Sequence, residues 1–322
     1  MTISDPIYGQ IEITEPVLVE IIETPAMQRL KGVDQNVTAN LLPVPWKPFS
    51  RFDHCIGVMH LIHTLGGDVE EQIAGLTHDI SHTAFSHVMD FVFDQEMTQG
   101  FHEQHLESIM NKSGIPPILQ KYHFNLDRII NHHNFSILEQ EIPALCADRV
   151  DYAVKTFYSV GMDVGEAGEF LKYLALESHR IVFTKAGPAE KFAKEFMKSD
   201  LEVWGGSARC NLAYHLFASV VKNAYTRGEV KLENFFSTDM QFLDKLGADS
   251  RRKIEELKHL AFLEVKATDA HDFHLNGKIR YVDPLVQTAE GTRKLAEISP
   301  GFASDLQQFL ARRKQGNYVK IL

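Results

Sequence analysis

Apolar residues recur at three- and four-residue spacing along most of the chain, and this periodicity constrains the fold more than any other feature of the sequence. Few stretches show the alternation that half-buried strands require. Glycine and proline clusters interrupt the pattern at Gly66-Gly67, Pro116-Pro117 and Pro143. The expected fold class is therefore mainly α, with helices over residues 17–22, 55–65, 69–76, 84–93, 105–110 and about 211–226.

Short β-branched stretches appear only in the second half of the chain. Residues 180–184, followed by Gly187-Pro188, predict a hairpin arm near residues 178–188. Residues 262–268 and 273–283 predict a small β-element, and the second stretch is centred on Asn276-Gly277, a typical turn pair.

The change from helical to mixed pattern predicts a division of the chain near residue 235. We expect a helical core over residues 1–235 and a C-terminal α+β appendage over residues 236–322. The appendage should end in a helix near residues 302–311.

Composition indicates a soluble, intracellular protein. No stretch approaches the roughly 18 apolar residues of a spanning helix, and the first ten residues carry Asp5 where a signal peptide would carry cations. The three cysteines, Cys55, Cys146 and Cys210, are odd in number and far apart, which argues against a disulfide framework. We therefore expect no membrane association and a cytoplasmic location.

The balance of charges argues against one large class of partners. The formal net charge is −10, whereas a general nucleic-acid binder needs a basic face. A small anionic substrate is still compatible with this charge, because it requires only a local group of Arg and Lys side chains.

Histidine is the unusual component of the composition. The chain has 16 His, of which eleven lie between His54 and His133. Histidine is the commonest metal ligand and titrates near neutral pH. A cluster this dense indicates metal or acid-base chemistry.

Four residues within or near this region suit one divalent cation: His54, the adjacent pair His78-Asp79, and Asp148. Any one of these histidines alone would more often be an ordinary side chain. Asp79 and Asp148 each follow an apolar run, however, and a carboxylate buried there without a cation would be unfavourable. The four together predict a metal site with open positions for water and substrate.

The sequence contains two other pairs of residues that resemble metal ligands. His78 and His82 are four residues apart, as in zinc proteases, but Asp79 stands where that motif needs the glutamate that acts as general base. A second pair, His271-Asp272, has no partner ligands at helical spacing and is expected to be a solvated loop feature.

The ordered motifs of the chain resemble those of the HD-domain phosphohydrolases, and most closely the branch that contains deoxynucleoside triphosphate triphosphohydrolases. The resemblance covers about residues 5–225 and implies an HD-domain helical core. It rests on Asp5-Pro6-Ile7-Tyr8-Gly9, Thr24-Pro25, Gln28-Arg29-Leu30, Arg51-Phe52-Asp53-His54, His78-Asp79-Ile80-Ser81-His82, Phe85-Ser86-His87, His102-Glu103 and Asp148-Arg149-Val150-Asp151-Tyr152.

The resemblance implies roles for residues in these motifs. The family's metal ligands fall on the same four residues found above, and they would hold one divalent ion, such as Mn, Fe, Ni, Co, Zn or Mg. The catalytic histidines fall on His82 and His102, and Asp90 would orient or charge one of them. His102 is expected to be the general acid for the leaving oxygen while a metal-activated water attacks phosphorus.

The resemblance also implies substrate contacts. The phosphate contacts fall on Arg51, Arg149 and His87. The nucleoside contacts fall on Gln35 and Tyr152. Tyr214 is a further nucleoside contact, by a weaker match within residues 209–215.

The sugar end departs from the family pattern at two positions. Asn36 replaces a bulky apolar residue, and Thr156 replaces an aspartate that holds the 3′-hydroxyl. Ribonucleotides, deoxyribonucleotides and phosphate esters that are not nucleotides therefore all remain candidate substrates. Relatives often form dimers or tetramers, so a homo-oligomer is expected.

Three functions are compatible with these residues. The first is a metal-dependent phosphohydrolase acting on a nucleotide. The second is an oxygenase-type protein with two metal ions, in which His102 and either His132 or His133 would become ligands. The third is a regulatory nucleotide-binding module with a decayed site, which is disfavoured because every residue of the predicted site is present. The number of metal ions per chain separates the first two.

Overall fold

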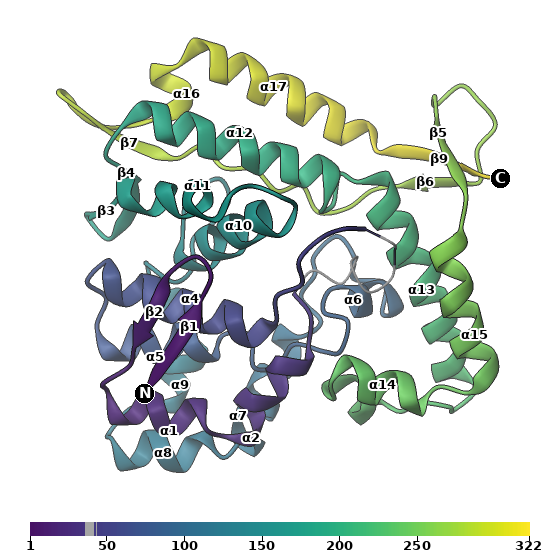
Figure 1. Cartoon of the computed structure of the whole chain (residues 1–322), viewed down its shortest axis with the longest axis horizontal. Coiled ribbons are helices and arrows are strands. Elements are labelled where there is room, and N and C mark those ends of the chain that lie inside the picture. The colour runs from purple at the N-terminus through teal and green to yellow at the C-terminus, as the bar shows by residue number, and fades with distance from the viewer. Residues whose placement is uncertain (36–41, 43) are drawn as a thin grey trace.

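The computed structural model describes residues 1–35, 42 and 44–322, and most of them are helical, which confirms the mainly α fold class (Figure 1). The helices are α1 (Pro16–Ile22), α2 (Pro25–Arg29), α4 (Arg51–Thr64), α5 (Val69–Thr77), α6 (Val88–Val92), α7 (Leu106–Lys112), α8 (Ile115–Lys121), α9 (Leu126–Ile130), α10 (Ala147–Ser159), α11 (Val164–Glu169), α12 (Ala186–Glu202), α13 (Ala208–Thr226), α14 (Asp239–Lys245), α15 (Ala248–Glu256), α16 (Leu295–Ile298) and α17 (Pro300–Gln315).

The strands form small sheets at the margins of the helical body (Figure 1). β1 (Thr2–Asp5) and β2 (Gly9–Glu12) make an N-terminal antiparallel hairpin. A second sheet has the order β3 (Leu174–Glu177), β4 (Arg180–Phe183), β7 (Leu285–Thr288) and β8 (Gly291–Lys294), in which β4 and β7 are parallel. The third sheet places β9 (Asn317–Ile321) between β5 (Phe262–Val265) and β6 (Phe273–Leu275).

The hairpin arm lies a few residues earlier than the sequence predicts. Its turn is at Ser178 and His179, which both have positive φ angles, of 49° and 62°. Gly187-Pro188 does not close a hairpin but lies in the first turn of α12, where the missing N–H of proline removes no intrahelical hydrogen bond. Asn276-Gly277 likewise makes no hairpin, because β6 pairs with the distant β9.

The helix predicted over residues 84–93 begins only at Val88. Phe85 and Ser86 have φ angles of 57° and 47°, and this left-handed conformation is incompatible with a right-handed helix. The turn is held by Asp239, whose carboxylate accepts a hydrogen bond of 2.7 Å from the Phe85 backbone N–H. The sequence pattern around residues 84–93 does not reveal this contact, because Asp239 is 154 residues away from Phe85.

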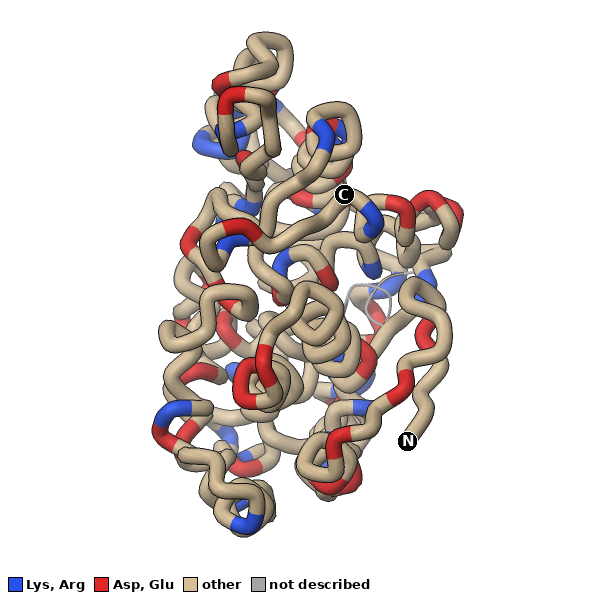
Figure 2. The backbone as a smooth tube through the Cα atoms, turned by 90° about the vertical axis from the view of Figure 1, so that its left-hand side faces the viewer, with Lys and Arg blue, Asp and Glu red and all other residues tan. Residues whose placement is uncertain are grey.

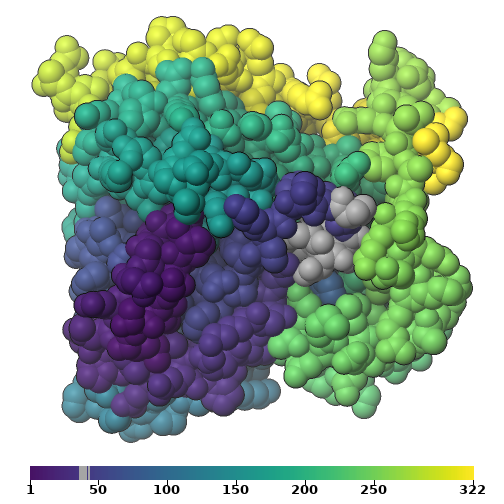
Figure 3. Space-filling model, viewed as in Figure 1, coloured from purple at the N-terminus to yellow at the C-terminus, as the bar shows by residue number. Residues whose placement is uncertain are grey.

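Residues on both sides of position 235 share the apolar core. Val286, Leu295 and Phe302 belong to the same buried cluster as α4, α5 and α10. The helices α14 and α15 pack on α6 and α13 in a second cluster. Figure 3 shows the C-terminal residues covering the upper and right-hand sides of the N-terminal half. The division near residue 235 stays a prediction, and the packing extends across it.

Charged residues of both signs are interspersed along the chain, without a continuous basic band in the view of Figure 2. Within the described ranges, no helix has the length and apolar character needed to cross a membrane.

The site depends on close packing of α4 against two other helices. A capping box starts α4: the Ser50 hydroxyl accepts from the Asp53 N–H at 3.1 Å, and the Asp53 carboxylate accepts from the Ser50 N–H at 2.8 Å. A Cβ at Gly75 of α5 would overlap Ile62 of α4, and a Cβ at Gly57 of α4 would overlap side-chain atoms of α10. Both glycines therefore allow helices to approach more closely than larger residues would.

We expect Gly57→Ala to destabilise the protein, because the added methyl group would overlap the carboxylate of Asp151 and the ammonium of Lys155. Overpacking of this kind reduces the free energy of unfolding by about 1–3 kcal/mol. Urea denaturation measures the change.

Gly187→Ala is the matched control. Nothing lies within 4 Å of a Cβ at Gly187, in the first turn of α12, so this change should be neutral or stabilise by about 0.4–1 kcal/mol. Equal stability of the two variants would contradict the close approach of α4 and α10.

Candidate metal centre and active-site pocket

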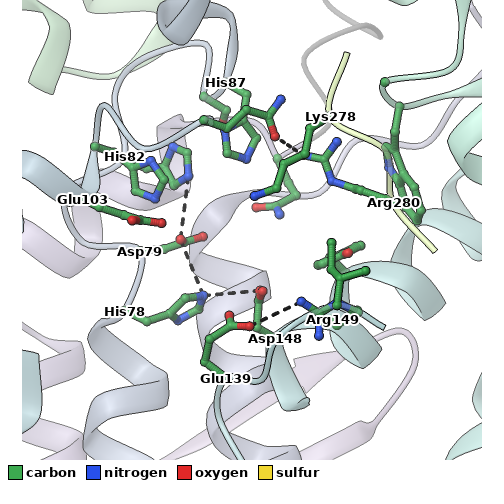
Figure 4. A pocket seen from close by; sticks show the side chains of 18 of the residues that line it. His78, Asp79, His82, His87, Glu103, Glu139, Asp148, Arg149, Lys278 and Arg280 are labelled. Atoms are coloured by element: carbon green, nitrogen blue, oxygen red, sulfur yellow. Dashed lines mark hydrogen bonds and ion pairs between the residues drawn. The ribbon is translucent and has the colours of Figure 1, made fainter. Parts of the chain in front are cut away.

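The four predicted ligands come together at the meeting point of three helices, and Figure 4 shows three of them, His78, Asp79 and Asp148. His54 lies on α4, His78 caps the C-terminus of α5 with Asp79 directly after it, and Asp148 lies in the first turn of α10. The His54 Nε2 atom is 2.9 Å from Asp148 Oδ1 and 3.7 Å from Asp79 Oδ2. The His78 Nε2 atom is 3.5 Å from Asp79 Oδ1 and 3.6 Å from Asp148 Oδ1.

The hydrogen bonds of the two histidines suit them as metal ligands. His54 Nδ1 lies 2.7 Å from Asp151 Oδ2, and His78 Nδ1 lies 2.7 Å from the Gly75 carbonyl oxygen. Donation of the Nδ1 proton to these acceptors leaves each Nε2 lone pair directed at the carboxylates. The His78 Nε2 atom is buried without a hydrogen-bond partner, as expected for a nitrogen reserved for a metal. The residues present therefore fit a divalent cation.

The electrostatics of this group also favour a cation. Burial lowers the pKa of His54 and His78, but hydrogen bonds and charges from the neighbouring aspartates outweigh burial, so both pKa values are raised. Burial raises the pKa of Asp79, but Arg51 and the two histidines outweigh it, so this pKa is lowered. A site that attracts protons to its histidines and keeps its carboxylates ionised has the negative potential that a divalent ion neutralises.

A buried network behind the metal site holds Asp151 in place. The Asp151 carboxylate is fully buried and also accepts from the Tyr8 hydroxyl at 2.8 Å. Its Oδ1 atom lies 3.2 Å from Lys155 Nζ, which in turn lies 3.2 Å from Asp5 Oδ2 and donates to the Asp53 carbonyl. The N-terminal hairpin that carries Asp5 and Tyr8 is thus linked through Asp151 to the ligand His54.

A cluster of three histidines lies beside the metal ligands. The rings of His82 and His102 stack at 3.8 Å, and His87 meets them edge-on at 4.9 Å and 5.7 Å. Asp79 connects the two groups, because its Oδ1 atom is 3.7 Å from His82 Nε2. One ring nitrogen from each of the three lies within 4.8 Å of the others, so this cluster could also hold a transition-metal ion.

Asp90 contacts His87 and also acts on His102 through its charge. Its carboxylate lies 3.0 Å from His87 Nδ1 and accepts from the Phe101 N–H at 3.0 Å. Its negative charge favours the protonated form of His102, as expected for a carboxylate that orients or charges one of the catalytic histidines. The contact with His87 is local, since Asp90 follows His87 by three residues at the start of α6 and so faces it across one turn.

These histidines are neutral near neutral pH. Burial, followed by the charge on His87, lowers the pKa of His102 to about 3. Burial, followed by Arg51, lowers the pKa of His82 and His87 well below its usual range. Burial raises the pKa of Asp90 to about 6. The charges of Asp79 and Asp90 offset this lowering only in part at His102, and a bound phosphoryl group would add negative charge that stabilises the protonated form.

The two predicted phosphate-binding arginines differ in their surroundings. Arg51 donates from Nη1 to Asp79 at 2.5 Å and from Nε to Ser86 Oγ at 3.0 Å, while its buried Nη2 has no hydrogen-bond partner among the described residues. Arg149 donates from Nη1 to the carbonyls of Gln140 and Ala144, its Nη2 pairs with Glu139 at 3.3 Å, and its buried Nε has no hydrogen-bond partner within the same ranges. Each arginine therefore has one nitrogen available for a phosphate, and that of Arg51 belongs to a side chain that also pairs with the predicted ligand Asp79.

The predicted nucleoside contacts line the same cavity, which has a volume of about 750 Å³. Gln35, Tyr152, Tyr214 and Thr156 all border it, and the buried Gln35 Oε1 has no hydrogen-bond partner. The Tyr152 ring is held edge-on to Trp204 at 5.3 Å. Asn36 lies outside the described residues.

The structure adds residues to which the sequence analysis assigned no role. Lys278 and Arg280 come from the segment between β6 and β7, and Glu103 and Glu139 border the opposite side (Figure 4). Asp151 belongs to a quoted motif, and its position three residues after Asp148 could have identified it as a second carboxylate on the same helix.

Among the described residues, the alternative ligand sets considered from the sequence do not come together as metal sites. Because α5 ends at Thr77, His78 and His82 do not share a helix face. The His132 ring lies 6.4 Å from that of His78, but among the described residues neither His132 nor His133 belongs to a group with metal-ligand spacing. His271-Asp272 is a structural element, since Asp272 accepts from the Ile321 N–H at 2.8 Å.

Comparison with known proteins identifies similar sequences and similar structures. The HD domain family matches residues 51–154. The uncharacterized protein YdhJ of Bacillus subtilis is 34% identical over 327 residues, covering 100% of this chain and 99% of that protein. The metal-dependent phosphohydrolase cns2 of Cordyceps militaris is 29% identical over 328 residues, covering 97% and 93% of the two chains.

Other similarities are partial or concern the fold alone. Human deoxynucleoside triphosphate triphosphohydrolase SAMHD1 is 36% identical over 142 residues, which span 37% of this chain and 22% of that protein. A crystal structure of a hypothetical protein from Aquifex aeolicus superposes with a TM-score of 0.65 at 19% identity, covering 98% of this chain and 99% of that one. This last similarity shows the fold.

We expect His54→Ala to abolish metal retention, because it removes a ligand and leaves Asp148 and Asp151 without the imidazole between them. Metal analysis of the purified variant, with circular dichroism as a check on folding, measures the effect. His63→Ala on the exposed side of the same helix is the control and should keep its metal. A stoichiometric metal in the His54 variant would show that the ligands are misassigned.

Asp151→Asn should weaken metal binding without removing a ligand. The amide cannot accept from His54 Nδ1, Tyr8 and Lys155 as the carboxylate does, and loss of such an outer partner reduces metal affinity about 10–100-fold. Competition with a chelator of known affinity measures the change. Asp127→Asn, at an exposed carboxylate on α9, should leave the affinity unchanged.

Proposed function

Because the chain belongs to the HD-domain family of metal-dependent phosphohydrolases, we propose that it hydrolyses a phosphate ester of a nucleotide, with a (deoxy)nucleoside triphosphate as the first candidate. The observation that carries this proposal is the side chain of Arg51. Its Nη1 pairs with the predicted ligand Asp79, and its Nη2 is buried in the pocket wall without a hydrogen-bond partner in the part of the chain that the structure describes. A phosphoryl oxygen is an acceptor that would satisfy this nitrogen next to the metal ligands.

Each group around the pocket then has a task. His54, His78, Asp79 and Asp148 would hold a divalent ion, which would polarise the phosphoryl group and lower the pKa of the attacking water. Arg51 and His87 hold phosphoryl oxygens, and Asp90 keeps the His87 ring oriented through its Nδ1 atom. His102 delivers a proton to the leaving oxygen. Burial disfavours the protonated imidazole of His102, and the negative charge of the substrate favours it. His82 stacks on the His102 ring and lies next to the Asp79 carboxylate, and it thereby positions His102.

The rest of the pocket supports a nucleoside. Tyr152, Trp204 and Tyr214 supply apolar faces for a sugar or base. The unpaired Gln35 Oε1 is an acceptor suited to a sugar hydroxyl. SAMHD1, which matches part of the chain, is named for its action on deoxynucleoside triphosphates.

A phosphate ester that is not a nucleotide is the second candidate. The relative that matches nearly the whole chain, cns2, is named as a metal-dependent phosphohydrolase without a substrate, whereas the match to SAMHD1 covers 37% of the chain. In addition, Thr156 borders the pocket where the deoxynucleotide-selective pattern has an aspartate.

A substrate panel tests the proposal. The purified protein is incubated with Mn, Co, Ni or Mg and with matched ribo- and deoxyribonucleoside mono- and triphosphates, alongside a simple aryl phosphate, and the products are separated by chromatography. Nucleotide turnover well above that of the aryl phosphate supports the proposal. Turnover of the aryl phosphate alone would instead favour the second candidate. Light scattering tests the expected homo-oligomer.

We expect His102→Ala to keep its metal and to lose about 10²–10⁴-fold in maximal rate, the usual contribution of a general acid. The KM should change little, because Arg51 and His87 still hold the phosphate. Steady-state kinetics and metal analysis on the same preparation measure both quantities. Loss of a second metal ion from this variant would contradict the mononuclear assignment and favour the dinuclear oxygenase class.

A further inference from the structure

The wall of the pocket across from the metal ligands carries two cations that the reaction proposed above does not use. Lys278 and Arg280 border the cavity, and Figure 4 shows both side chains entering from the side opposite to His78 and Asp79. They lie in the segment between β6 and β7, more than 100 residues beyond the last metal ligand. We ask what these two positive charges bind.

Lys278 and Arg280 alternate with two apolar residues in the segment between β6 and β7. Both cations line the cavity. Ile279 and Tyr281 face the other way and pack against the main apolar cluster. The alternation buries apolar side chains and leaves the charged ones at the pocket.

The backbone of this segment is fastened to the pocket wall. The Arg280 N–H donates to Asp200 Oδ1 at 3.0 Å, and the buried Arg313, paired with the same carboxylate, donates to the Gly277 carbonyl at 3.1 Å. Gly205 and Gly277 lie against each other, and a Cβ on Gly277 would come within 2.8 Å of the Gly205 carbonyl oxygen. The two cations are therefore held in position before a ligand arrives.

The two side chains have few partners of their own. Arg280 donates to the side-chain oxygen of Gln99, and Lys278 Nζ is 3.5 Å from the Thr98 carbonyl. Neither forms an ion pair with a carboxylate in the described ranges, and the remaining positions, 36–41 and 43, include no acidic residue. Burial and the nearby Arg280 lower the pKa of Lys278, although Glu103 and Glu139 act in the opposite direction. Two like charges held together without a counterion are typical of an anion site.

We propose that Lys278 and Arg280 form a second anion subsite, which binds a phosphoryl group of the substrate other than the one attacked at the metal. The inference rests on the proposed function, and it narrows the substrate to compounds with at least two phosphoryl groups. The second group is either part of the same polyphosphate chain or attached elsewhere on the molecule. A substrate with a single phosphoryl group would leave both cations without an anion.

Calorimetric titration of the metal-loaded protein, with free metal held constant, tests the subsite without any turnover. Phosphate is compared with pyrophosphate, and adenosine 5′-monophosphate with adenosine 3′,5′-bisphosphate. At least one of the two-phosphoryl ligands should bind at least about 10-fold more tightly than the single-phosphoryl ligand with which it is compared. This is the usual effect of added charged hydrogen bonds. The pair that shows the preference tells whether the second group is adjacent or remote.

Lys278→Gln and Arg280→Gln keep side-chain volume and remove one charge each. Each should reduce the two-phosphoryl preference about 10-fold and leave the affinity for the single-phosphoryl ligand unchanged. Lys320→Ala, an exposed cation of the same C-terminal segment, is the control and should leave the preference intact. Thermal unfolding confirms that the variants are folded.

Equal affinity for one and two phosphoryl groups in the wild type would overturn the proposal. So would a preference that survives in both glutamine variants, or an equal loss for both kinds of ligand. Phosphate and pyrophosphate contain no nucleoside, so this result is independent of the nucleotide panel. If the panel shows no nucleotide turnover but the pyrophosphate preference depends on Lys278 and Arg280, the nucleotide assignment fails and the subsite stands.

Discussion

The hydrogen bond between His54 and Asp151 is the interaction on which the rest of the site depends. It fixes the Nδ1 proton of His54 and thereby directs the Nε2 lone pair toward Asp79 and Asp148. The Asp151 carboxylate is fully buried, so it needs a cation and several donors, which Lys155 and Tyr8 provide. The N-terminal hairpin, the absence of a side chain at Gly57 and the packing of α10 on α4 all follow from the need to satisfy this one buried charge.

His54, His78, Asp79 and Asp148 could be proposed as a metal-ligand set from the sequence because their context is local. Asp79 and Asp148 each follow an apolar run, and a carboxylate at the end of such a run needs a cation. The packing of α4, α5 and α10 then brings these residues together. The long helices were also predictable, since α13 and α17 repeat apolar residues at helical spacing over 19 and 16 residues. Asp151 was harder to assign, because only the structure shows that it lies behind the metal site while Asp148 lies in it.

Features that depend on distant contacts could not be predicted in this way. The late start of α6 depends on a hydrogen bond from Phe85 to Asp239, 154 residues away. β6 pairs with β9, more than 40 residues away, and this partner is not visible in the local pattern around Asn276-Gly277. The role of Lys278 and Arg280 is hidden for the same reason. Their alternation with apolar residues is typical of a strand, but they lie between β6 and β7, and the position of their segment follows from Asp200 and Arg313.

The arrangement of charge in the pocket would allow a chain with a net charge of −10 to accept the proposed polyanion. Negative charge is concentrated at the predicted metal ligands, where a divalent ion would compensate it, and Arg51 connects this region to the neighbouring histidines. Positive charge lies farther along the wall, on Lys278 and Arg280. A bound phosphate ester would therefore be oriented by the pocket, with one phosphoryl group at the metal and its remaining negative charge toward the C-terminal segment. Because Lys278 and Arg280 lie within residues 236–322, the packing of this part of the chain on the helical core would complete the proposed substrate site as well as the fold.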